Sequence, residues 1–351
     1  MASLLPKTQA GPIGVDIGSR SVKLLQLDGH GSEIRETSRW DLPPDDSNNP
    51  QLRDQQIVEA IEHARAGHNF RGKKAVFCLG ADNLFVQNIR VAKAEGEELT
   101  KIVNFEAAGR VPFAGDEAEI RYVEADDVRQ GDSIRREVIL LACHRPAIER
   151  IIGIAENAGL QADAIDIEPA AMLRCYCKQF RRDDDKQRRM MFVNIGASTT
   201  MAVIAKGSDP MFVKYIDIGG KHFDEAVAKR LKMPLKDAVA LRRHNGDRRA
   251  DHRDADITRS ISEATRPVLD RLENELSMCI RYYSVTFRGQ PLAGIIFGGG
   301  ESSDALVEWA AKRFDIPCEA GDPLRSYRQP QNSGRRGQWD VAAGLALRGA
   351  E

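Results

Sequence analysis

Two segments that lie far apart in the chain share one residue pattern, and the pattern suits phosphate binding. Residues 15–29 (VDIGSRSVKLLQLDG) and 193–207 (VNIGASTTMAVIAKG) each place an acid or amide and a glycine at the end of an apolar strand, followed by small polar residues and a second strand. A glycine at such a bend has no Cβ, so backbone N–H groups can approach an anion closely. Two such bends facing each other would hold a polyphosphate from both sides, which predicts a nucleotide-binding cleft.

Each bend offers polar side chains as well as backbone amides. The candidate phosphate contacts are Gly18, Ser19 and Ser21 in the first bend (residues 18–21) and Gly196, Ser198 and Thr199 in the second bend (residues 196–199). Asp16 stands shortly before the first bend, where its carboxylate can hold a cation through water. For either bend alone the alternative is a strand that ends in a tight turn, and it is the repetition that favours a nucleotide site.

Two further glycine clusters follow later apolar strands. They are Gly219 and Gly220 in one cluster and Gly298, Gly299 and Gly300 in the other. The first cluster precedes a predicted helix, whose N-terminus attracts anions, although such glycines can also simply turn a corner. The second cluster directly follows a buried strand, where glycines usually mean that something packs flat against the backbone. We expect an adenine ring there.

Length, net charge and cysteine content limit which classes of protein the chain can belong to. A chain of 351 residues suggests two domains or lobes, and its net charge of −1 gives no basic field that would favour nucleic acid. The six cysteines show no disulfide framework or metal spacing, so we expect reduced thiols in a reducing compartment. No segment has the composition of a signal peptide or a membrane span, and we therefore expect a soluble, cytoplasmic protein.

The order of predicted elements divides the chain into lobes. Residues 84–167 read as strand, helix, strand, strand, helix, strand, which is typical of a ferredoxin-like β-α-β-β-α-β subdomain inserted into the first lobe. Its open sheet edge could accept an extended partner segment, or the unit could only buttress the lobe. The other expected parts are the first lobe (11–83), a connecting helix (168–190), the second lobe with the second bend (191–220), its outer subdomain (221–285), its adenosine loop (286–330) and a return to the first lobe (331–351).

Taken together, these motifs resemble the actin-like ATPase superfamily, which includes actin, heat-shock chaperones, sugar kinases and the division protein FtsA. The resemblance narrows to the PilM family of type IV pilus assembly proteins. It is carried by VNFEAAGRVPF (103–113), AGLQADAIDIEPAAMLR (158–174), YIDIGGKHFDEAV (215–227) and VAAGLALRG (341–349). It implies an α/β, two-lobed, ribonuclease-H-like fold in which the inserted ferredoxin-like subdomain replaces the usual outer one of actin.

The resemblance also implies ATP and Mg²⁺ as ligands. Carried over by position, the nucleotide contacts are Asp16, Gly18, Ser19, Arg20, Ser21 and Lys23, then Gly196, Ala197, Ser198 and Thr199, then Gly219, Gly220, Gly298, Gly299 and Gly300. Asn194 stands where the family usually shows an aspartate, which keeps an oxygen ligand beside Asp16 for the cation but removes a charge. In the stretch 237–243 (DAVALRR), Arg242 is expected to replace a lysine that meets the adenosine. Both departures favour binding over turnover, with at most a weak ATPase.

The partner that the resemblance implies is the N-terminal cytoplasmic tail of a PilN-like inner-membrane protein, alongside other pilus assembly components. It places the protein peripherally at the inner membrane, which it reaches only through partners. We expect the tail to dock near Phe105, Val111 and Phe113, because this apolar cluster follows an amphipathic helix. The alternative is that these three side chains form the core of the inserted subdomain.

Two other function classes stay open on the same fold. A sugar kinase would need a carboxylate base beside the γ-phosphate, but Asp217 and Asp224 are better explained as a strand exit and a helix-start charge, and Glu168 as a charge that favours a helix N-terminus. An FtsA-like division protein would need an amphipathic helix after the last predicted helix. The sequence reads only LALRGAE there, so we expect no such anchor.

Overall fold

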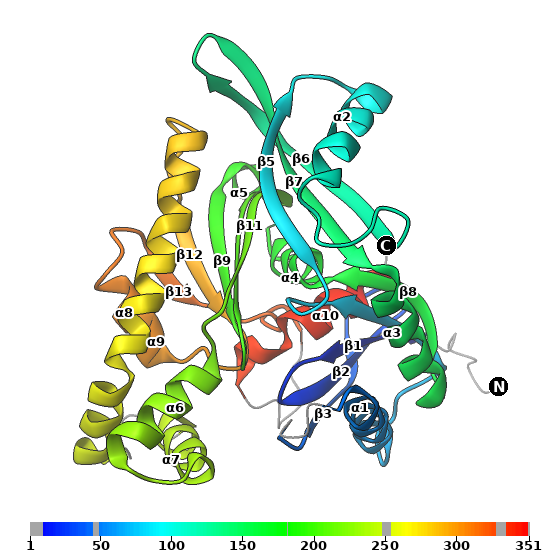
Figure 1. Cartoon of the computed structure of the whole chain (residues 1–351). Helices are drawn as coiled ribbons and strands as arrows, with labels where there is room; N and C mark the ends of the chain where they lie inside the picture. Colours follow the sequence, from blue (N-terminus) through cyan, green and yellow to red (C-terminus); the bar gives the residue numbers. More distant parts are fainter. Residues whose placement is uncertain (1–9, 45–48, 181, 248–253, 328–334, 350–351) are drawn as a thin grey trace, which may run out of the picture.

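The computed structural model describes residues 10–44, 49–180, 182–247, 254–327 and 335–349, which form two lobes, each built on a five-stranded sheet (Figure 1). A third, three-stranded sheet belongs to an inserted unit. Across these described stretches, no helix combines the length and the apolar character that crossing a membrane requires.

The sheet of the first lobe has the strand order β3-β2-β1-β4-β8. The strands are β1 (Ala10–Ile17), β2 (Ser21–Asp28), β3 (Ile34–Asp41), β4 (Lys74–Leu79) and β8 (Gln161–Ile167). The helices that cover it are α1 (Pro50–Arg65) and α3 (Arg145–Asn157) on one face and α4 (Glu168–Cys177) and α10 (Asp340–Leu347) on the other. Because β1 pairs antiparallel with β2, the first bend lies at the end of the central strand.

Alternating side chains bury both faces of β1. Ile13 and Val15 are fully buried in the core that includes α1 and α3. Gly14, between them, faces α10, where a Cβ would lie only 2.2 Å from the carbonyl oxygen of Ala342. The backbone of α10 therefore packs directly on the sheet and requires a glycine at this position.

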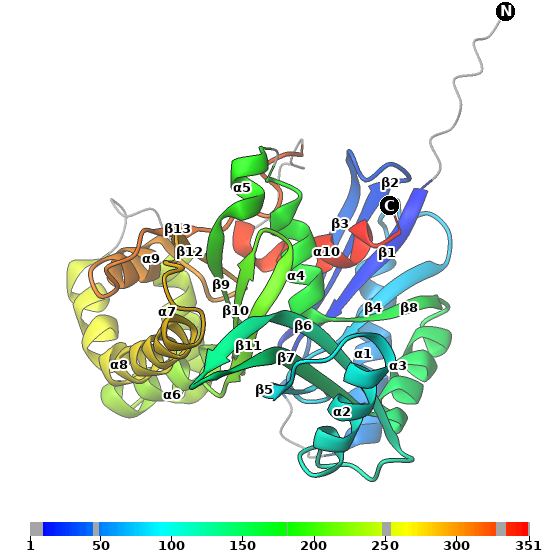
Figure 2. The same cartoon turned by 90° about the horizontal axis from the view of Figure 1, so that it is seen from above.

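The second lobe repeats the same plan. Its sheet has the order β11-β10-β9-β12-β13, with strands β9 (Arg189–Ile195), β10 (Thr200–Lys206), β11 (Asp209–Ile216), β12 (Gly294–Gly298) and β13 (Cys318–Ala320). Its helices are α6 (Gly220–Leu231), α7 (Leu235–Asp247), α8 (Ala255–Thr286) and α9 (Asp304–Ala311), and the short α5 (Asp183–Gln187) precedes the sheet. A 3₁₀ turn, η2 (Arg336–Trp339), leads into α10, and residues 331–334 of the predicted return lie outside the described residues. In Figure 2, α4 and α10 lie between the two sheets.

The inserted unit is shorter than the sequence predicts. It consists of β5 (Phe85–Ala92), α2 (Gly96–Ala108), β6 (Ala118–Gln130) and β7 (Ser133–His144), in the sheet order β5-β7-β6. The predicted closing elements, α3 and β8, belong to the first lobe, where β8 pairs parallel with β4 and the apolar face of α3 joins the first core. The predicted element order is observed, but the ferredoxin-like closure and the boundary at residue 167 are wrong, because β8 completes a different sheet.

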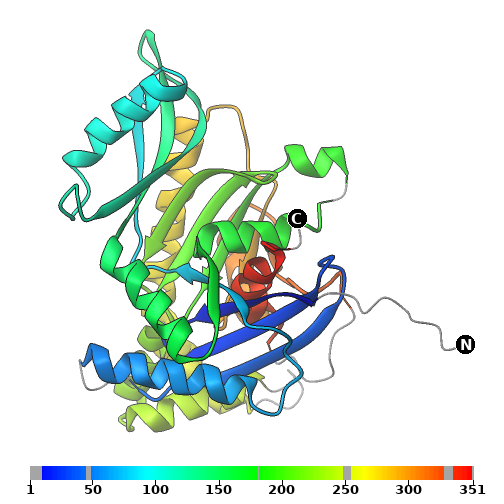
Figure 3. The same ribbon diagram turned by 90° about the vertical axis from the view of Figure 1, so that its right-hand side faces the viewer.

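The inserted unit also contacts the second lobe, as its position above both sheets in Figures 1 and 3 shows. The Asn88 side chain on β5 donates to the Val213 carbonyl on β11 at 2.9 Å. Glu137 on β7 is completely buried and accepts hydrogen bonds from Arg90 at 2.8 Å and from Tyr282 on α8. The inserted unit is thus an insertion in the chain of the first lobe, but it forms hydrogen bonds with the second lobe.

Candidate functional site

The two bends meet at the interface of the lobes. Each is the same tight turn, in which Gly18 donates to the Ser21 carbonyl at 3.0 Å and Gly196 to the Thr199 carbonyl at 2.9 Å. The Ser198 hydroxyl of the second bend donates to the Ser19 hydroxyl of the first at 2.9 Å. A pair of residues separated by 179 positions in sequence therefore brings the two turns into direct contact.

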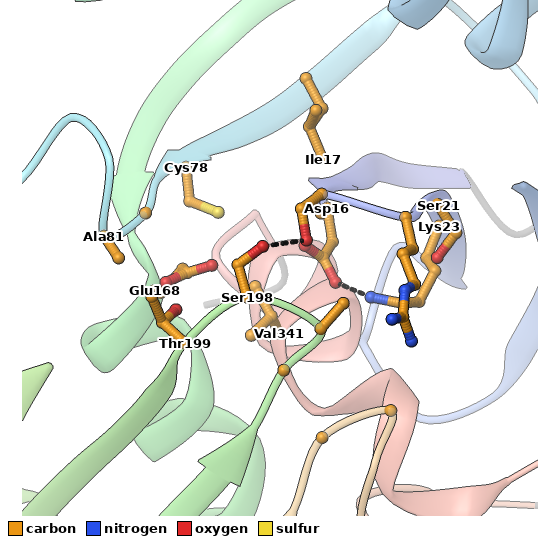
Figure 4. Close-up of a pocket in the computed structure, with 18 of the residues that line it drawn as sticks. Asp16, Ile17, Ser21, Lys23, Cys78, Ala81, Glu168, Ser198, Thr199 and Val341 are labelled. Carbon is orange, nitrogen blue, oxygen red and sulfur yellow. Dashed lines mark hydrogen bonds and ion pairs between the residues drawn. The ribbon is translucent and has the colours of Figure 1, made fainter. Parts of the chain in front are cut away.

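A cavity of about 170 Å³ lies between the bends, and most predicted nucleotide contacts line it. These are Asp16, Gly18, Ser19, Arg20, Ser21, Lys23, Asn194, Gly196, Ala197, Ser198, Thr199, Gly299 and Gly300. Figure 4 shows side chains from both lobes around it, among them Asp16, Lys23, Ser198 and Thr199. The predicted contacts Gly219, Gly220, Arg242 and Gly298 do not line this cavity.

Gly219 and Gly220 support the second bend from behind. The backbone N–H of Gly220 donates to the Gly196 carbonyl at 3.0 Å, and a Cβ on Gly219 would lie 2.6 Å from the Ser198 carbonyl carbon. The Gly220 N–H and the close packing of Gly219 thus shape the bend, whereas the Gly219 N–H donates to the His222 ring at 3.1 Å.

The glycine triplet 298–300 has two different environments. A Cβ on Gly298 would lie 2.5 Å from the Tyr176 hydroxyl, and one on Gly299, which has φ +87°, would lie 2.4 Å from the Ile195 carbonyl oxygen. Protein atoms therefore explain these two glycines. Gly300 has no heavy atom within 4 Å of the Cβ position, so it offers the open backbone that a flat ring would need.

The two predicted cation ligands already have protein partners. Asp16 is buried and forms an ion pair with Lys23. The Asn194 amide donates to the Asp340 carboxylate at 2.8 Å, and burial raises the pKa of Asp340 to about 7. An aspartate at position 194 would set a second carboxylate against the buried Asp340, whereas the asparagine amide donates to it.

The oxygen donors in the cavity fit Mg²⁺ only as partial ligands. Among the described residues, no group of three or more His, Cys, Asp or Glu side chains is placed to hold a metal ion. A bound Mg²⁺ keeps several waters and often takes its remaining ligands from substrate phosphates. Asp16 and the Asn194 carbonyl oxygen could contribute to such a shell.

Glu168 is a cavity residue that the sequence analysis explained only as a helix-start charge. It begins α4 and lines the cavity (Figure 4). Its carboxyl group accepts a hydrogen bond from the Tyr215 hydroxyl at 3.0 Å. Its side chain fills the space beside Gly80, where a Cβ would lie 2.8 Å from the Glu168 Oε1. Burial, together with the nearby Asp16 carboxylate, raises the pKa of Glu168 to about 8, so the group is mainly protonated at pH 7.

Charged side chains from both lobes form an arginine cluster at the edge of the cavity. Its members are Arg20, Arg242, Arg243 and Arg335 with the buried carboxylates Asp224 and Glu301. Arg242, which we expected to meet adenosine, instead donates to Asp224 at 2.6 Å and to Glu301 at 2.8 Å. These arginines hold the pKa of Glu301 below its usual value even though burial alone would raise it. Arg20, Arg242 and Arg243 alone set three guanidinium groups against these two carboxylates, and this excess of positive charge suits an anionic ligand.

The three predicted partner contacts differ in their exposure and packing. Phe105 on α2 is 81% exposed. Val111 packs against the core of the inserted unit, and Phe113 stacks on His144 with ring centroids 5.4 Å apart. The core alternative therefore holds for Val111, while Phe105 is free to contact another molecule.

Solved structures show that the fold is the actin-like one. The structure of a PilM-PilN type IV pilus biogenesis complex has a TM-score of 0.78 at 24% identity and covers 97% of this chain and 99% of that one. The ethanolamine utilization protein EutJ of Carboxydothermus hydrogenoformans has a TM-score of 0.59 at 14% identity, over 99% and 92%. MreB5 of Spiroplasma citri bound to AMPPNP has a TM-score of 0.51 at 14% identity, over 97% and 96%. The predicted two-lobed α/β fold class is confirmed.

Sequence comparison identifies which family of this fold the chain belongs to. The cell division protein FtsA of Neisseria meningitidis serogroup B is 24% identical over 199 residues, which cover 50% of this chain and 46% of FtsA, so the match spans less than half of that relative. The sequence profile of the type IV pilus assembly protein PilM matches residues 14–350, nearly the whole chain. The chain belongs to the PilM family of type IV pilus assembly proteins.

Proposed function

We propose that this protein is a nucleotide-binding scaffold of type IV pilus assembly, which holds ATP between its lobes and docks the tail of a PilN-like membrane protein. The contact between the Ser19 and Ser198 hydroxyls carries the nucleotide part, because it brings two identical glycine turns around one cavity. The family carries the pilus part.

The phosphates would lie between the two bends. There the hydroxyls of Ser19 and Ser198 separate to donate to phosphate oxygens instead of to each other, and Lys23 turns from Asp16 to phosphate. The arginine cluster supplies the surplus positive charge, and the open backbone at Gly300 receives the adenosine. A bound Mg²⁺ would neutralise phosphate charge, with Asp16 and Asn194 nearest to it.

The cavity supports binding better than turnover. Hydrolysis needs a group that orients or deprotonates a water beside the terminal phosphate. Glu168 is a cavity carboxyl group that could do this, but its raised pKa leaves it mainly protonated near pH 7. We therefore propose ATP binding with at most weak hydrolysis.

The partner proposal rests on the family and on the PilM-PilN complex that shares the fold. We propose that the N-terminal cytoplasmic tail of a PilN-like protein holds the chain at the inner membrane, together with other assembly components. Phe105 is the strongest contact candidate, because a phenylalanine that is 81% exposed gains most from being covered.

Isothermal titration with Mg-ATP tests the nucleotide proposal. Asp16→Ala should weaken binding at least tenfold, because the cation loses its carboxylate ligand. The matched control is Asp217→Ala, which removes an exposed carboxylate outside the cavity and should change affinity less than twofold. Absence of binding to the wild type, or equal loss in both variants, would refute the proposal.

A pull-down with a PilN-type tail peptide tests the docking proposal. Phe105→Glu should reduce capture strongly without unfolding, because the side chain is already exposed. Ile134→Glu, an exposed apolar residue elsewhere on the inserted unit, is the control and should bind normally. Undiminished capture by Phe105→Glu would place the tail elsewhere.

A further inference from the structure

Arg20 links the two lobes directly. Its side chain leaves the first bend and pairs with Asp224 on α6 and with Glu301, whose Oε1 lies 2.9 Å from the guanidinium. Both carboxylates are almost completely buried, whereas a quarter of the Arg20 side chain remains exposed to solvent. The residue that crosses the interface therefore belongs to the bend that is expected to contact phosphate.

The two carboxylates do not depend on Arg20 for their charge balance. Asp224 also pairs with Arg242 at 2.6 Å, and Glu301 pairs with Arg242 at 2.8 Å and with Arg243 at 3.0 Å. Losing one partner of a buried ion pair is costly mainly because the other charge is left unpaired. Here each carboxylate keeps at least one arginine, so Arg20 can leave at a reduced cost.

We propose that Arg20 is a latch between the lobes, which pairs with Asp224 and Glu301 in the nucleotide-free protein and transfers to the polyphosphate when a nucleotide binds. The inference rests on the proposed nucleotide binding. In it, the carboxylates of the second lobe and the phosphates of the nucleotide compete for the Arg20 side chain. A guanidinium suits both states, since it forms charge-assisted hydrogen bonds with carboxylate and with phosphate alike. One side chain cannot bind the carboxylates and the phosphates at the same time. The Arg20 contact between the lobes therefore weakens nucleotide binding, and nucleotide binding weakens that contact to the same degree.

A double-mutant cycle separates the latch from a simple effect of net charge. Asp224→Asn removes one of the two negative charges that hold Arg20, so Mg-ATP should bind about tenfold more tightly by titration. In an Arg20→Gln background the same substitution should change the ATP affinity less than twofold, because no latch remains to release. Melting temperatures of all variants check that each is folded.

Equal tightening by Asp224→Asn in both backgrounds would show a charge effect alone and overturn the latch, as would no tightening in the presence of Arg20. If the wild type and Asp224→Asn bind no ATP, the proposed nucleotide function and the transfer to phosphate both fail, and hydrogen exchange of the nucleotide-free protein decides whether Arg20 joins the lobes. Arg20→Gln should then speed amide exchange in residues 18–21 and 196–199 at least fivefold. Arg313→Gln, which breaks an ion pair with Glu273 inside the second lobe, should not. Equal exchange in the two variants would overturn the latch.

Discussion

Replacing Glu137 with alanine should loosen the inserted unit from the second lobe. Glu137 on β7 is completely buried and holds both Arg90, at 2.8 Å, and the Tyr282 hydroxyl on α8. Arg90 also donates to Thr286 on α8 at 2.6 Å. The substitution leaves a partly buried guanidinium without its carboxylate and removes the polar connection between β7 and α8.

The expected loss follows from the burial of this pair. Breaking a buried ion pair on one side costs about 3–5 kcal/mol, and because a third of the Arg90 side chain is exposed we expect the lower end, about 3 kcal/mol. If the whole chain unfolds together, an unfolding entropy of about 2 cal/mol/K per residue converts this into a fall in Tm of about 4 °C. If the unit detaches alone, its amide exchange accelerates by about two orders of magnitude.

Calorimetry together with hydrogen exchange measures both outcomes. The matched control is Glu124→Ala, which removes a half-exposed carboxylate that pairs with Arg136 within the same unit and should cost no more than about 1 kcal/mol. A Glu137→Ala protein with the Tm and the β5–β7 exchange rates of the control would refute the role of this network in joining the unit to the second lobe.

Two further predictions concern the cavity and the core. Because the folded-state pKa of Glu168, about 8, lies above its unfolded value, the folded protein gains stability from this proton below about pH 4.5 and loses that stability as the pH rises through 8. Thermal melts from pH 5 to pH 9 should therefore show a steeper fall in Tm for the wild type than for Glu168→Gln, and parallel curves would contradict the raised pKa. Gly344→Ala should lower the free energy of unfolding by about 3 kcal/mol, since its Cβ would lie 1.8 Å from the Ala171 carbonyl oxygen where α10 crosses α4. Gly153→Ala, in α3 with open space at the Cβ, should instead stabilise the protein by about 1 kcal/mol, and similar effects of the two substitutions in denaturant titrations would disprove this packing argument.

The local patterns of the sequence were sufficient to find the bends. A strand, a glycine and a returning strand are contiguous in the chain, so their repetition at 15–29 and 193–207 predicts both turns and the matching topology of the two lobes. The end of the inserted unit could not be found in this way. The partner of β8 is β4, whose paired residues lie 87 or 88 positions earlier, and the element order reads the same whichever sheet β8 joins.

Charged residues of the cavity were harder to assign, because each has a sufficient local explanation. Glu168 begins a helix and Asp224 lies within the first turns of another, which is an ordinary place for an acid. Glu301 directly follows the glycine triplet without matching any motif. Glu168 bonds to Tyr215 of the other lobe, and Asp224 and Glu301 pair both with Arg20 across the interface and with Arg242 inside their own lobe. Only the folded chain brings these partners together. Arg242 donates to the carboxylates Asp224 and Glu301, and its expected contact with adenosine stays a prediction.

Hydrogen exchange with and without saturating Mg-ATP tests the central claim most directly, that both bends enclose one nucleotide. We predict that amides in residues 18–21 and in residues 196–199 become protected together, at least tenfold, and with the same dependence on ATP concentration. Protection of one bend without the other, or of neither while ATP is bound, would contradict a shared site between the lobes.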